Sequence, residues 1–443
     1  MAIDTPAAAA PEFEALPRFN LARTLKIGSF HIGSSLTDTL TSAVVNRVLI
    51  VEMGIAAWPI SLLVALRYIL LSPLGLWISY LSDTHAIRNS RRIAYIWLGR
   101  GLMLFSLPLL ALAVGDIARA AGSIWGWTLA SFSFLVYGLG TLISGGPFLA
   151  LVQESAPYAR RGQVIAVVQT ILVASFAFVG IFYGSLLPVW EYERFLQLVL
   201  VALIGAAFFW LVSVWREERP APVVAAAARP SYRRTFAGML ADQRLRRYGL
   251  FLAISAFFAF MFDLVLEPFG GDLFGLPVGE TTRFGAYWGS GVLLAMIAAA
   301  YFTRRWRPDQ QVQTTLWGLA LLGITVLLLA LTSWLALEAL LRPTLILFGV
   351  GFGIYTVGGV ALLMAMSRDA HAASYLALWS TIQLVFRGFG LAAGGVLRDL
   401  ALWLTADFAR TYALVFAVEG VGLLLCILLL RRVDVRGFAR DRH

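Results

Sequence analysis

The stretch ARTYALVFAVEGVGLLLCILLL, residues 409–430, contains only two charged side chains. A helix needs about 20 mostly apolar residues to cross the hydrocarbon core of a bilayer, so this stretch predicts a transmembrane helix. Similar stretches recur along the chain and predict an all-α, polytopic membrane protein of about twelve transmembrane helices. The predicted spans are residues 28–51, 57–81, 93–114, 125–149, 163–187, 195–215, 248–266, 284–303, 312–332, 342–366, 373–397 and 409–430.

The composition of the chain agrees with a membrane protein. Of its 443 residues, 60% are hydrophobic and only 14% are charged, whereas about a quarter of the residues of a soluble domain are charged. A soluble fold could not cover this much apolar surface, but a lipid bilayer can. The single cysteine, Cys426, excludes an intrachain disulfide and a cysteine-based metal cluster.

The positive charge of the chain is distributed unevenly. A formal net charge of +10 would suggest nucleic-acid binding in a soluble protein. Here most Lys and Arg residues lie in alternate loops and in the two terminal segments, as they do in the cytoplasmic parts of membrane proteins. The pattern therefore predicts that both termini are cytoplasmic, and it explains the basic charge without nucleic acid as a partner.

The longest hydrophilic segment, residues 216–247, separates six predicted spans from six more. Its second part, residues 231–247, alternates apolar and basic residues at helical spacing, which predicts an amphipathic helix at the lipid surface. The predicted organisation is a cytoplasmic tail with an interfacial segment (1–27), an N-terminal six-helix bundle (28–215), a basic linker (216–247), a C-terminal six-helix bundle (248–430) and a cytoplasmic tail (431–443).

Two six-helix halves joined by a basic linker resemble the major facilitator superfamily, whose halves are pseudo-repeats. Two loops resemble motifs of that superfamily: SYLSDT (79–84) with the arginine pair that follows, and PYARRG (157–162). The resemblance implies a cytoplasmic latch between helix ends, whereas the alternative is ordinary basic loop charge. The latch residues would be Asp83, Arg91, Arg92, Pro157, Arg161 and Gly162.

Three further patches resemble the PucC/LhaA family. They are NRVLIVEMG (46–54), LEPFGGDLFG (266–275) and the residues from Leu378 to Asp399 in the eleventh span. The Ser/Thr-rich first span and the altered loop at 79–84 depart from that family's pattern. The residues that carry the resemblance are Glu52, Gly54, Glu267, Pro268, Gly270, Gly271, Arg398 and Asp399.

This narrower resemblance implies a function in phototrophic bacteria. Members of the family assist the assembly of light-harvesting complexes and are thought to handle (bacterio)chlorophyll for antenna polypeptides. The implied location is the bacterial inner membrane, in its intracytoplasmic or photosynthetic part. The implied partners are the lipid bilayer, antenna subunits or the reaction-centre complex, and a chlorophyll synthase.

Ionisable residues inside a span are energetically costly and usually face a cavity or a partner. The first span is unusually polar, and Ser35, Asp38 and Ser42 would share one face of a helix, so we expect this span to line a central cavity. Asp263 would face the same space from the seventh span. The cavity-lining or pigment-binding candidates are His31, Ser35, Asp38, Ser42, Asn46, Arg47, Asp263, Gln383 and Arg387.

Two of these interpretations have structural alternatives. His31 could ligate the Mg of a chlorophyll, but a single histidine in a span is more often a hydrogen-bond partner between helices. The charged residues Arg67, Arg100, Arg387 and Glu419 could instead form structural ion pairs near helix ends. No other metal site is indicated.

No catalytic constellation is present in the sequence: it lacks a P-loop, a G-x-S-x-G motif and an H-E-x-x-H motif. The chain is therefore not expected to be an enzyme. Two alternatives to a pigment-handling assembly factor remain. One is a secondary transporter that uses Asp38 and Asp263, and the other is a pigment-free partner subunit of a photosynthetic complex or a chlorophyll synthase.

Overall fold

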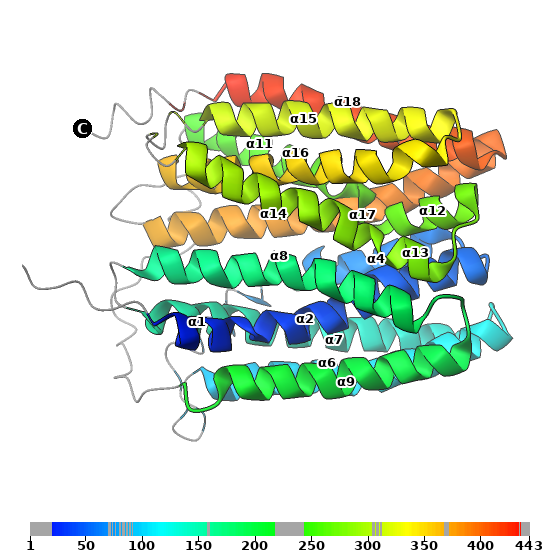
Figure 1. Ribbon diagram of the computed structural model, residues 1–443, viewed down its shortest axis with the longest axis horizontal. Coiled ribbons are helices and arrows are strands. Elements are labelled where there is room, and N and C mark those ends of the chain that lie inside the picture. Colours follow the sequence, from blue (N-terminus) through cyan, green and yellow to red (C-terminus); the bar gives the residue numbers. More distant parts are fainter. Residues whose placement is uncertain are drawn as a thin grey trace, which may run out of the picture.

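Long helices that run side by side make up the part of the protein that the structure describes (Figure 1). This computed structural model describes residues 20–69, 92–156, 160–217, 243–303, 312–366 and 372–433, with residue 435 and isolated residues of 70–91 and 304–311. Within these ranges, ten helices are long and apolar enough to cross a membrane. The first span, which is polar, and the second, which is described only in part, bring the total to the predicted twelve.

The first span is one continuous stretch of helical turns from Leu21 to Glu52. It comprises α1 (Leu21–Gly28), α2 (Phe30–Asp38), the π-helical turn η1 (Thr39–Val44), α3 (Val45–Arg47) and a second π-helical turn, η2 (Val48–Glu52). The rest of the N-terminal half consists of α4 (Ala57–Ile69), α6 (Ile93–Arg119), α7 (Ile124–Glu154), α8 (Arg161–Leu186) and α9 (Tyr192–Val214).

The seventh span is interrupted in its middle. It begins with α11 (Gln243–Ala259), tightens into the 3-10 turn η5 (Met261–Leu264) and continues as α12 (Leu266–Phe274). The remaining helices are α13 (Val278–Thr282), α14 (Phe284–Thr303), α15 (Val312–Trp334), α16 (Glu338–Ala365), α17 (Ala372–Thr405) and α18 (Phe408–Arg431).

The two halves repeat one packing pattern. α2 packs against α8 and α9, as α11 packs against α17 and α18, and the pair α6 and α7 corresponds to the pair α15 and α16. The halves meet where α4 contacts α17 and where α8 contacts α13 and α14. This arrangement agrees with the prediction of two six-helix pseudo-repeats.

We name the two ends of the bundle after helices that lie there, the α1 end and the α12 end (Figure 1). The last turns of α18 lie at the α1 end, so the described chain begins and ends on one side. The tail before residue 20, the residues after 435 and the first part of the predicted amphipathic helix, residues 231–242, lie outside the described residues.

Helical turns continue past the predicted end of two spans. The seventh span was predicted to end at residue 266, but α12 carries its helical turns to Phe274. The eleventh was predicted to end at residue 397, but α17 continues to Thr405. Hydropathy placed both ends too early because Asp272 and Arg398 read as loop residues, whereas the structure pairs these two charges with each other.

Candidate ligand site at the centre of the bundle

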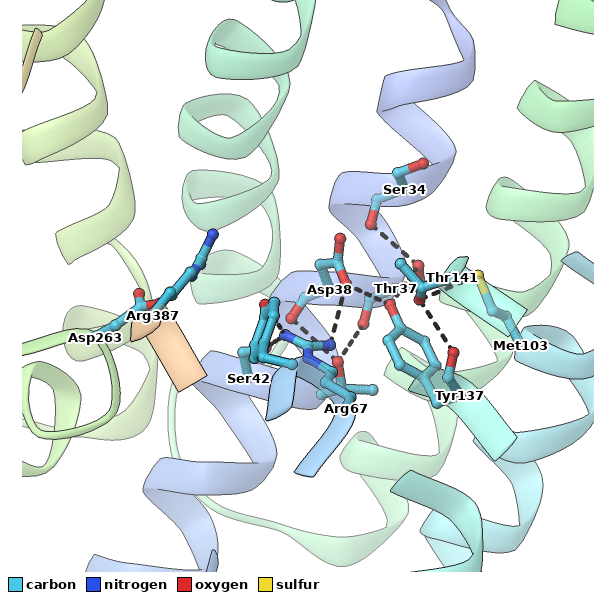
Figure 2. A network of polar contacts seen from close by, with 12 residues as sticks. Ser34, Thr37, Asp38, Ser42, Arg67, Met103, Tyr137, Thr141, Asp263 and Arg387 are labelled. Atoms are coloured by element: carbon cyan, nitrogen blue, oxygen red, sulfur yellow. Dashed lines mark hydrogen bonds and ion pairs between the residues drawn. The ribbon is translucent and has the colours of Figure 1, made fainter. Parts of the chain in front are cut away.

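Asp38 is the centre of a polar network in the N-terminal half (Figure 2). The hydroxyl of Tyr137, on α7, donates a hydrogen bond of 2.6 Å to Asp38 Oδ1. Arg67, on α4, places Nη1 3.7 Å from the same oxygen. Asp38 is the last residue of α2, directly before the π-helical turn η1. Three helices therefore converge on one carboxylate at a helix irregularity, and such irregularities are frequent at functional sites.

The guanidinium of Arg67 links the first span to the second. Its Nη2 donates to the hydroxyl of Tyr68 at 2.7 Å and to Ser42 Oγ at 3.4 Å. The guanidinium also lies 4.6 Å from the centre of the Tyr68 ring, within the range of a cation–π contact. The predicted cavity-lining residues Asp38 and Ser42 thus share one arginine.

A second network, in which an arginine again pairs with an aspartate and contacts aromatic rings, lies in the C-terminal half. Arg387, on α17, donates a 2.9 Å hydrogen bond from Nη2 to Asp263 Oδ2 in the 3-10 turn η5. The Arg387 guanidinium also lies 4.2 Å from the ring centre of Phe260 and 5.0 Å from that of Tyr68. Figure 2 shows this pair beside the Asp38 network. The ring of Tyr68 therefore contacts arginines from both halves.

The acidic residues of the two networks are not sealed into the core. The side chains of Asp38 and Asp263 are each 28% exposed, and that of Arg387 is 31% exposed, whereas Arg67 is nearly buried. Charged groups inside a membrane protein mark ligand or ion pathways. Interrupted helices near the middle of a span carry binding sites in transporters of this architecture. We therefore take the two networks together as the candidate ligand site.

Arg100 and Glu419 differ from the other charged residues in the spans. The ion-pair interpretation holds for Arg67 and Arg387, but it was wrong for Arg100 and Glu419. Among the described residues, no acidic side chain forms an ion pair with Arg100, and no basic side chain forms one with Glu419. The Arg100 guanidinium lies instead over the rings of Phe30, at 4.3 Å, and Trp210, at 4.6 Å.

The remaining cavity candidates lie around this centre. His31 packs edge-on against Phe148, with ring centres 5.3 Å apart, and its role as a Mg ligand stays a prediction. Gln383 lies one turn before Arg387 on α17 and is half-buried. Ser35 is fully buried, and its Oγ has no partner among the described residues. The shared face predicted for Ser35, Asp38 and Ser42 assumed a regular α-helix, which the π-helical turn η1 interrupts.

Asn46 and Arg47 were also predicted to line the cavity. In the structure they connect the first span to the seventh span at the α12 end. Asn46 Nδ2 donates to the carbonyl oxygen of Leu264 at 2.8 Å. Arg47 donates to Glu52 Oε1 at 2.7 Å and to the carbonyl oxygen of Leu276 at 2.9 Å. Both side chains are buried, and their role in lining a cavity or binding a pigment stays a prediction. The sequence could not show this connection because their partners are backbone carbonyls of the other half.

The third motif patch, from Leu378 to Asp399, also forms contacts at the α12 end of the bundle. Arg398 pairs with Asp272 and with Asp399, whose carboxylate is 2.7 Å away. The hydroxyl of Tyr412 donates to Asp272 Oδ2 at 2.6 Å. The backbone N–H of Trp58 donates to Asp399 Oδ2 at 2.7 Å, which connects the second span to the eleventh.

The glycines of the motifs allow this close packing. A Cβ atom at Gly271 would lie 2.9 Å from Arg47 Nη2, and one at Gly270 would lie 2.6 Å from the ring of Phe284. Gly54 has a φ of +63°, which favours glycine. Pro268 lies in the first turn of α12, and Glu267 beside it is buried. The motif residues thus pack together at the α12 end of the bundle.

The α1 end is held together by other charges. Arg92 Nη2 donates to Glu154 Oε1 at 2.9 Å, which joins the start of α6 to the end of α7. Arg161 and Gly162 open α8. The predicted latch residues Asp83, Arg91 and Pro157 lie outside the described residues.

Sequence reasoning missed Glu217, which follows α9 at the α1 end. Its carboxylate accepts hydrogen bonds from Arg23 Nε at 2.7 Å and from Lys26 Nζ at 2.8 Å, and both donors lie on α1. Burial alone would raise the pKa of Glu217, but the hydrogen bonds from Lys26 and Arg23 lower the pKa below its usual value. The available signal was an acidic residue among the many basic ones of the predicted linker.

The fold is similar to that of known transporters. A bacterial homologue of the lysosomal transporter Spinster, inward-facing and unoccupied, superposes with a TM-score of 0.72 at 13% identity and covers 95% of this chain and 98% of its own. A D-xylose–proton symporter superposes with a TM-score of 0.70 at 14% identity, covering 94% and 98%. At these identities the similarity establishes the fold alone.

Sequence relatives give a narrower assignment. Protein PucC of Rhodobacter capsulatus is 27% identical, covering 92% of this chain and 91% of its own length. A protein named bacteriochlorophyll synthase 44.5 kDa chain, from Rhodobacter capsulatus, is also 27% identical, covering 94% and 96%. The family model described as PUCC protein matches residues 44–438, which include all three motif patches. The chain is therefore a multi-pass membrane protein that belongs to the PUCC protein family.

Proposed function

We propose that this protein is an assembly factor for bacterial light-harvesting or photosynthetic complexes, and that it binds or delivers (bacterio)chlorophyll to antenna polypeptides. The observation that supports this most is the accessible charged cluster Asp38–Arg67 and Asp263–Arg387, which meets at Tyr68 between the two halves. A purely structural scaffold does not need costly charged groups exposed at the centre of a membrane bundle. Membership of the PUCC family adds the link to photosynthesis.

The pigment would be held by residues of several helices. Tyr68 and Phe260 offer aromatic surface between the networks, and Arg67 and Arg387 offer hydrogen-bond donors. His31, whose ring lies edge-on against Phe148, would ligate Mg from the α1 side of the cluster. The pigment itself supplies light absorption and the Mg ion, whereas the protein binds and orients it.

We further propose that the protein works in the bacterial inner membrane with both termini in the cytoplasm and without catalysing a reaction itself. Its partners would be antenna subunits or the reaction-centre complex, and a chlorophyll synthase. The relative named as a bacteriochlorophyll synthase chain is consistent with such an association.

Purification tests the proposal directly. Tagged protein would be isolated in mild detergent from a phototrophic bacterium that expresses it, followed by an absorption spectrum and identification of the proteins that copurify. We expect a chlorophyll-type absorption band together with antenna subunits or a chlorophyll synthase. Unchanged antenna levels in a deletion strain without a second family member would contradict the proposal.

The ion pairs also leave a secondary transporter of a small solute as a second candidate. Asp38 and Asp263 each pair with an arginine of a neighbouring span, and such pairs can open and close with solute binding. Uptake into proteoliposomes that disappears in Asp38→Asn would favour transport. Stable copurification with a photosynthetic complex in the absence of pigment would instead favour a pigment-free partner subunit.

A further inference from the structure

Two buried acids of the C-terminal half have no cation that neutralises them. Glu419, in the middle of α18, is 0% exposed, and Glu267, in the first turn of α12, is 8% exposed. Among the described residues, no basic side chain forms an ion pair with either acid, and Oε2 of Glu267 has no hydrogen-bond partner. An ionised carboxylate without a countercharge is very costly to bury, so such an acid takes up a proton instead.

Both acids lie beside the interruption of the seventh span. The carboxyl group of Glu419 interacts with the backbone of Phe262, in the 3-10 turn η5, and Glu267 follows that turn at the start of α12. The charge of Asp263, also in η5, acts on both acids, and its repulsion opposes a second negative charge nearby. The side chain of Asp263 is 28% exposed, so it connects the two buried acids to the accessible centre of the bundle.

The other charged groups on the packed elements have partners or lie elsewhere. α15 contains no charged residue, and the arginines of α18 lie at its two ends. The arginines of α11 lie at its beginning, where Arg247 donates to the carbonyl oxygen of Arg432. Tyr248, Tyr412 and Cys426 are uncharged at neutral pH. The ion pairs on the remaining elements are those of Arg387 with Asp263, Arg398 with Asp272 and Asp399, Arg47 with Glu52, and Arg283 with Glu280.

We propose that Glu267 and Glu419 form a proton-binding site, and that its occupancy is coupled to the ion pair of Asp263 with Arg387. A metal ion fits less well, because no group of three His, Cys, Asp or Glu among the described residues could hold one, and hard cations such as Ca²⁺ take about six oxygen ligands or more. The proton comes from water and adds to a carboxylate oxygen, and no other bond changes. The site does not require that the ligand of the protein is a pigment.

The coupling follows from the charges around Arg387. While both glutamates are protonated, Asp263 is the negative group of the three and holds Arg387 at 2.9 Å. Loss of a proton would place a second carboxylate beside Asp263, which repels Asp263 and competes for the arginine. A ligand that displaces Asp263 from Arg387 and the proton on the glutamates therefore affect each other, and such linkage is reciprocal.

Infrared spectroscopy detects the proton directly. Purified protein in detergent would be compared in H₂O and D₂O at neutral pH, because the C=O stretch of a protonated carboxylic acid is distinct from carboxylate bands and shifts on deuteration. We expect a protonated-acid band in the wild type that loses intensity in Glu267→Gln and in Glu419→Gln. Glutamine resembles the protonated acid in shape, so both variants should fold, which thermal unfolding verifies. Glu338→Gln, at an exposed acid in the first turn of α16, is the control and should keep the full band.

A pH titration of the same band measures the coupling. Asp263→Asn removes the negative charge beside the two glutamates, so they should release their protons at a pH about one unit lower than in the wild type. Replacing choline chloride with sodium chloride at constant ionic strength should leave the band unchanged, because the site takes a proton rather than a metal cation.

Three results would overturn parts of this inference. A band that is unchanged in both glutamate variants would overturn the proton site. A band that sodium chloride removes would replace the proton with a metal cation. An unchanged titration midpoint in Asp263→Asn would overturn the coupling to the ion pair. Pigment absorption and copurification of antenna subunits are separate measurements, so these results leave the proposed function standing.

Discussion

At the scale of single residues, the charged side chains of the spans fall into two groups with different energetics. At the α12 end, Arg398 is buried and pairs with Asp272 and Asp399. Those at the centre are paired but accessible, as Asp263 is with Arg387. The first group stabilises the α12 end, and we propose that the second exchanges its partners for a ligand.

Removing one member of the buried pair should be strongly destabilising. We expect Arg398→Met to lower the free energy of unfolding by about 3 to 5 kcal/mol, because it leaves Asp272 buried without a countercharge. The measurement is thermal unfolding in detergent. The double variant Arg398→Met with Asp272→Leu should recover much of the loss, since it removes both charges. A double variant as unstable as the single one would show that the pair is not the cause.

Glu217 predicts a pH dependence at the α1 end. Its pKa is lower in the folded protein than in the unfolded chain. Its ion pairs with Arg23 and Lys26 therefore stabilise the folded state above the unfolded pKa, and this contribution is lost as the pH falls through the folded pKa. We expect the wild type to lose thermal stability between about pH 5 and pH 3 more steeply than Glu217→Gln. Parallel curves for the two proteins would contradict this assignment.

At the scale of elements, close contact between helices depends on glycine. A Cβ atom at Gly184 of α8 would lie 2.4 Å from the carbonyl oxygen of Gly279 in α13, which is backbone and cannot rotate away. A Cβ atom at Gly394 of α17 would lie 2.2 Å from the carbonyl oxygen of Met261 in η5. The first contact joins the two halves, and the second packs α17 against the interrupted seventh span.

This packing predicts opposite effects at two helix glycines. Gly184→Ala should destabilise the protein by about 1 to 3 kcal/mol, because the halves must move apart to accept the methyl group. Gly101→Ala, on α6 where no atom lies within 4 Å of the new Cβ, should be neutral or stabilising by up to about 1 kcal/mol. Thermal unfolding of both variants measures the difference. Equal effects would mean that the contact between α8 and α13 is more pliable than its geometry indicates.

At the scale of the whole molecule, the ion pairs and hydrogen bonds described above differ between the two ends of the bundle. Some connect the two halves, and others lie within one half. At the α12 end, Asn46, Arg47 and Asp399 connect the N-terminal half to the C-terminal half. At the α1 end, the described ion pairs of Glu217 and of Arg92 with Glu154 lie within the N-terminal half alone. Among these contacts, those that join the two halves lie at the α12 end.

The orientation of the bundle is predicted from its loop charges and can be measured. The described chain begins and ends at the α1 end (Figure 1), and the basic loops predict that this end faces the cytoplasm. A fluorescent protein fused after residue 443 should therefore be fluorescent, and a periplasmic phosphatase fused there should be inactive. An active phosphatase fusion would contradict the predicted orientation.

Much of the fold could be predicted from the sequence. Hydropathy located the spans because lipid imposes a length of about 20 apolar residues on each helix. It stopped short of α12 and of the last turns of α17, where Asp272 and Arg398 form an ion pair although they are 126 residues apart in sequence. The boundary between the ninth and tenth spans could be seen only approximately, and the structure places it between Trp334 and Glu338.

For the candidate site, the sequence determined which residue types are available, because charged and polar side chains inside predicted spans stand out against an apolar background. It identified Asp38, Asp263 and Arg387 in this way. Only the tertiary structure decided that Arg67 and Arg387 meet at Tyr68 and that Asn46 and Arg47 bind backbone carbonyls. It also decided that Arg100 lies over aromatic rings and forms no ion pair with another described residue. A local sequence pattern fixes which residues share a helix, whereas the pairing of charges depends on which helices the fold brings together.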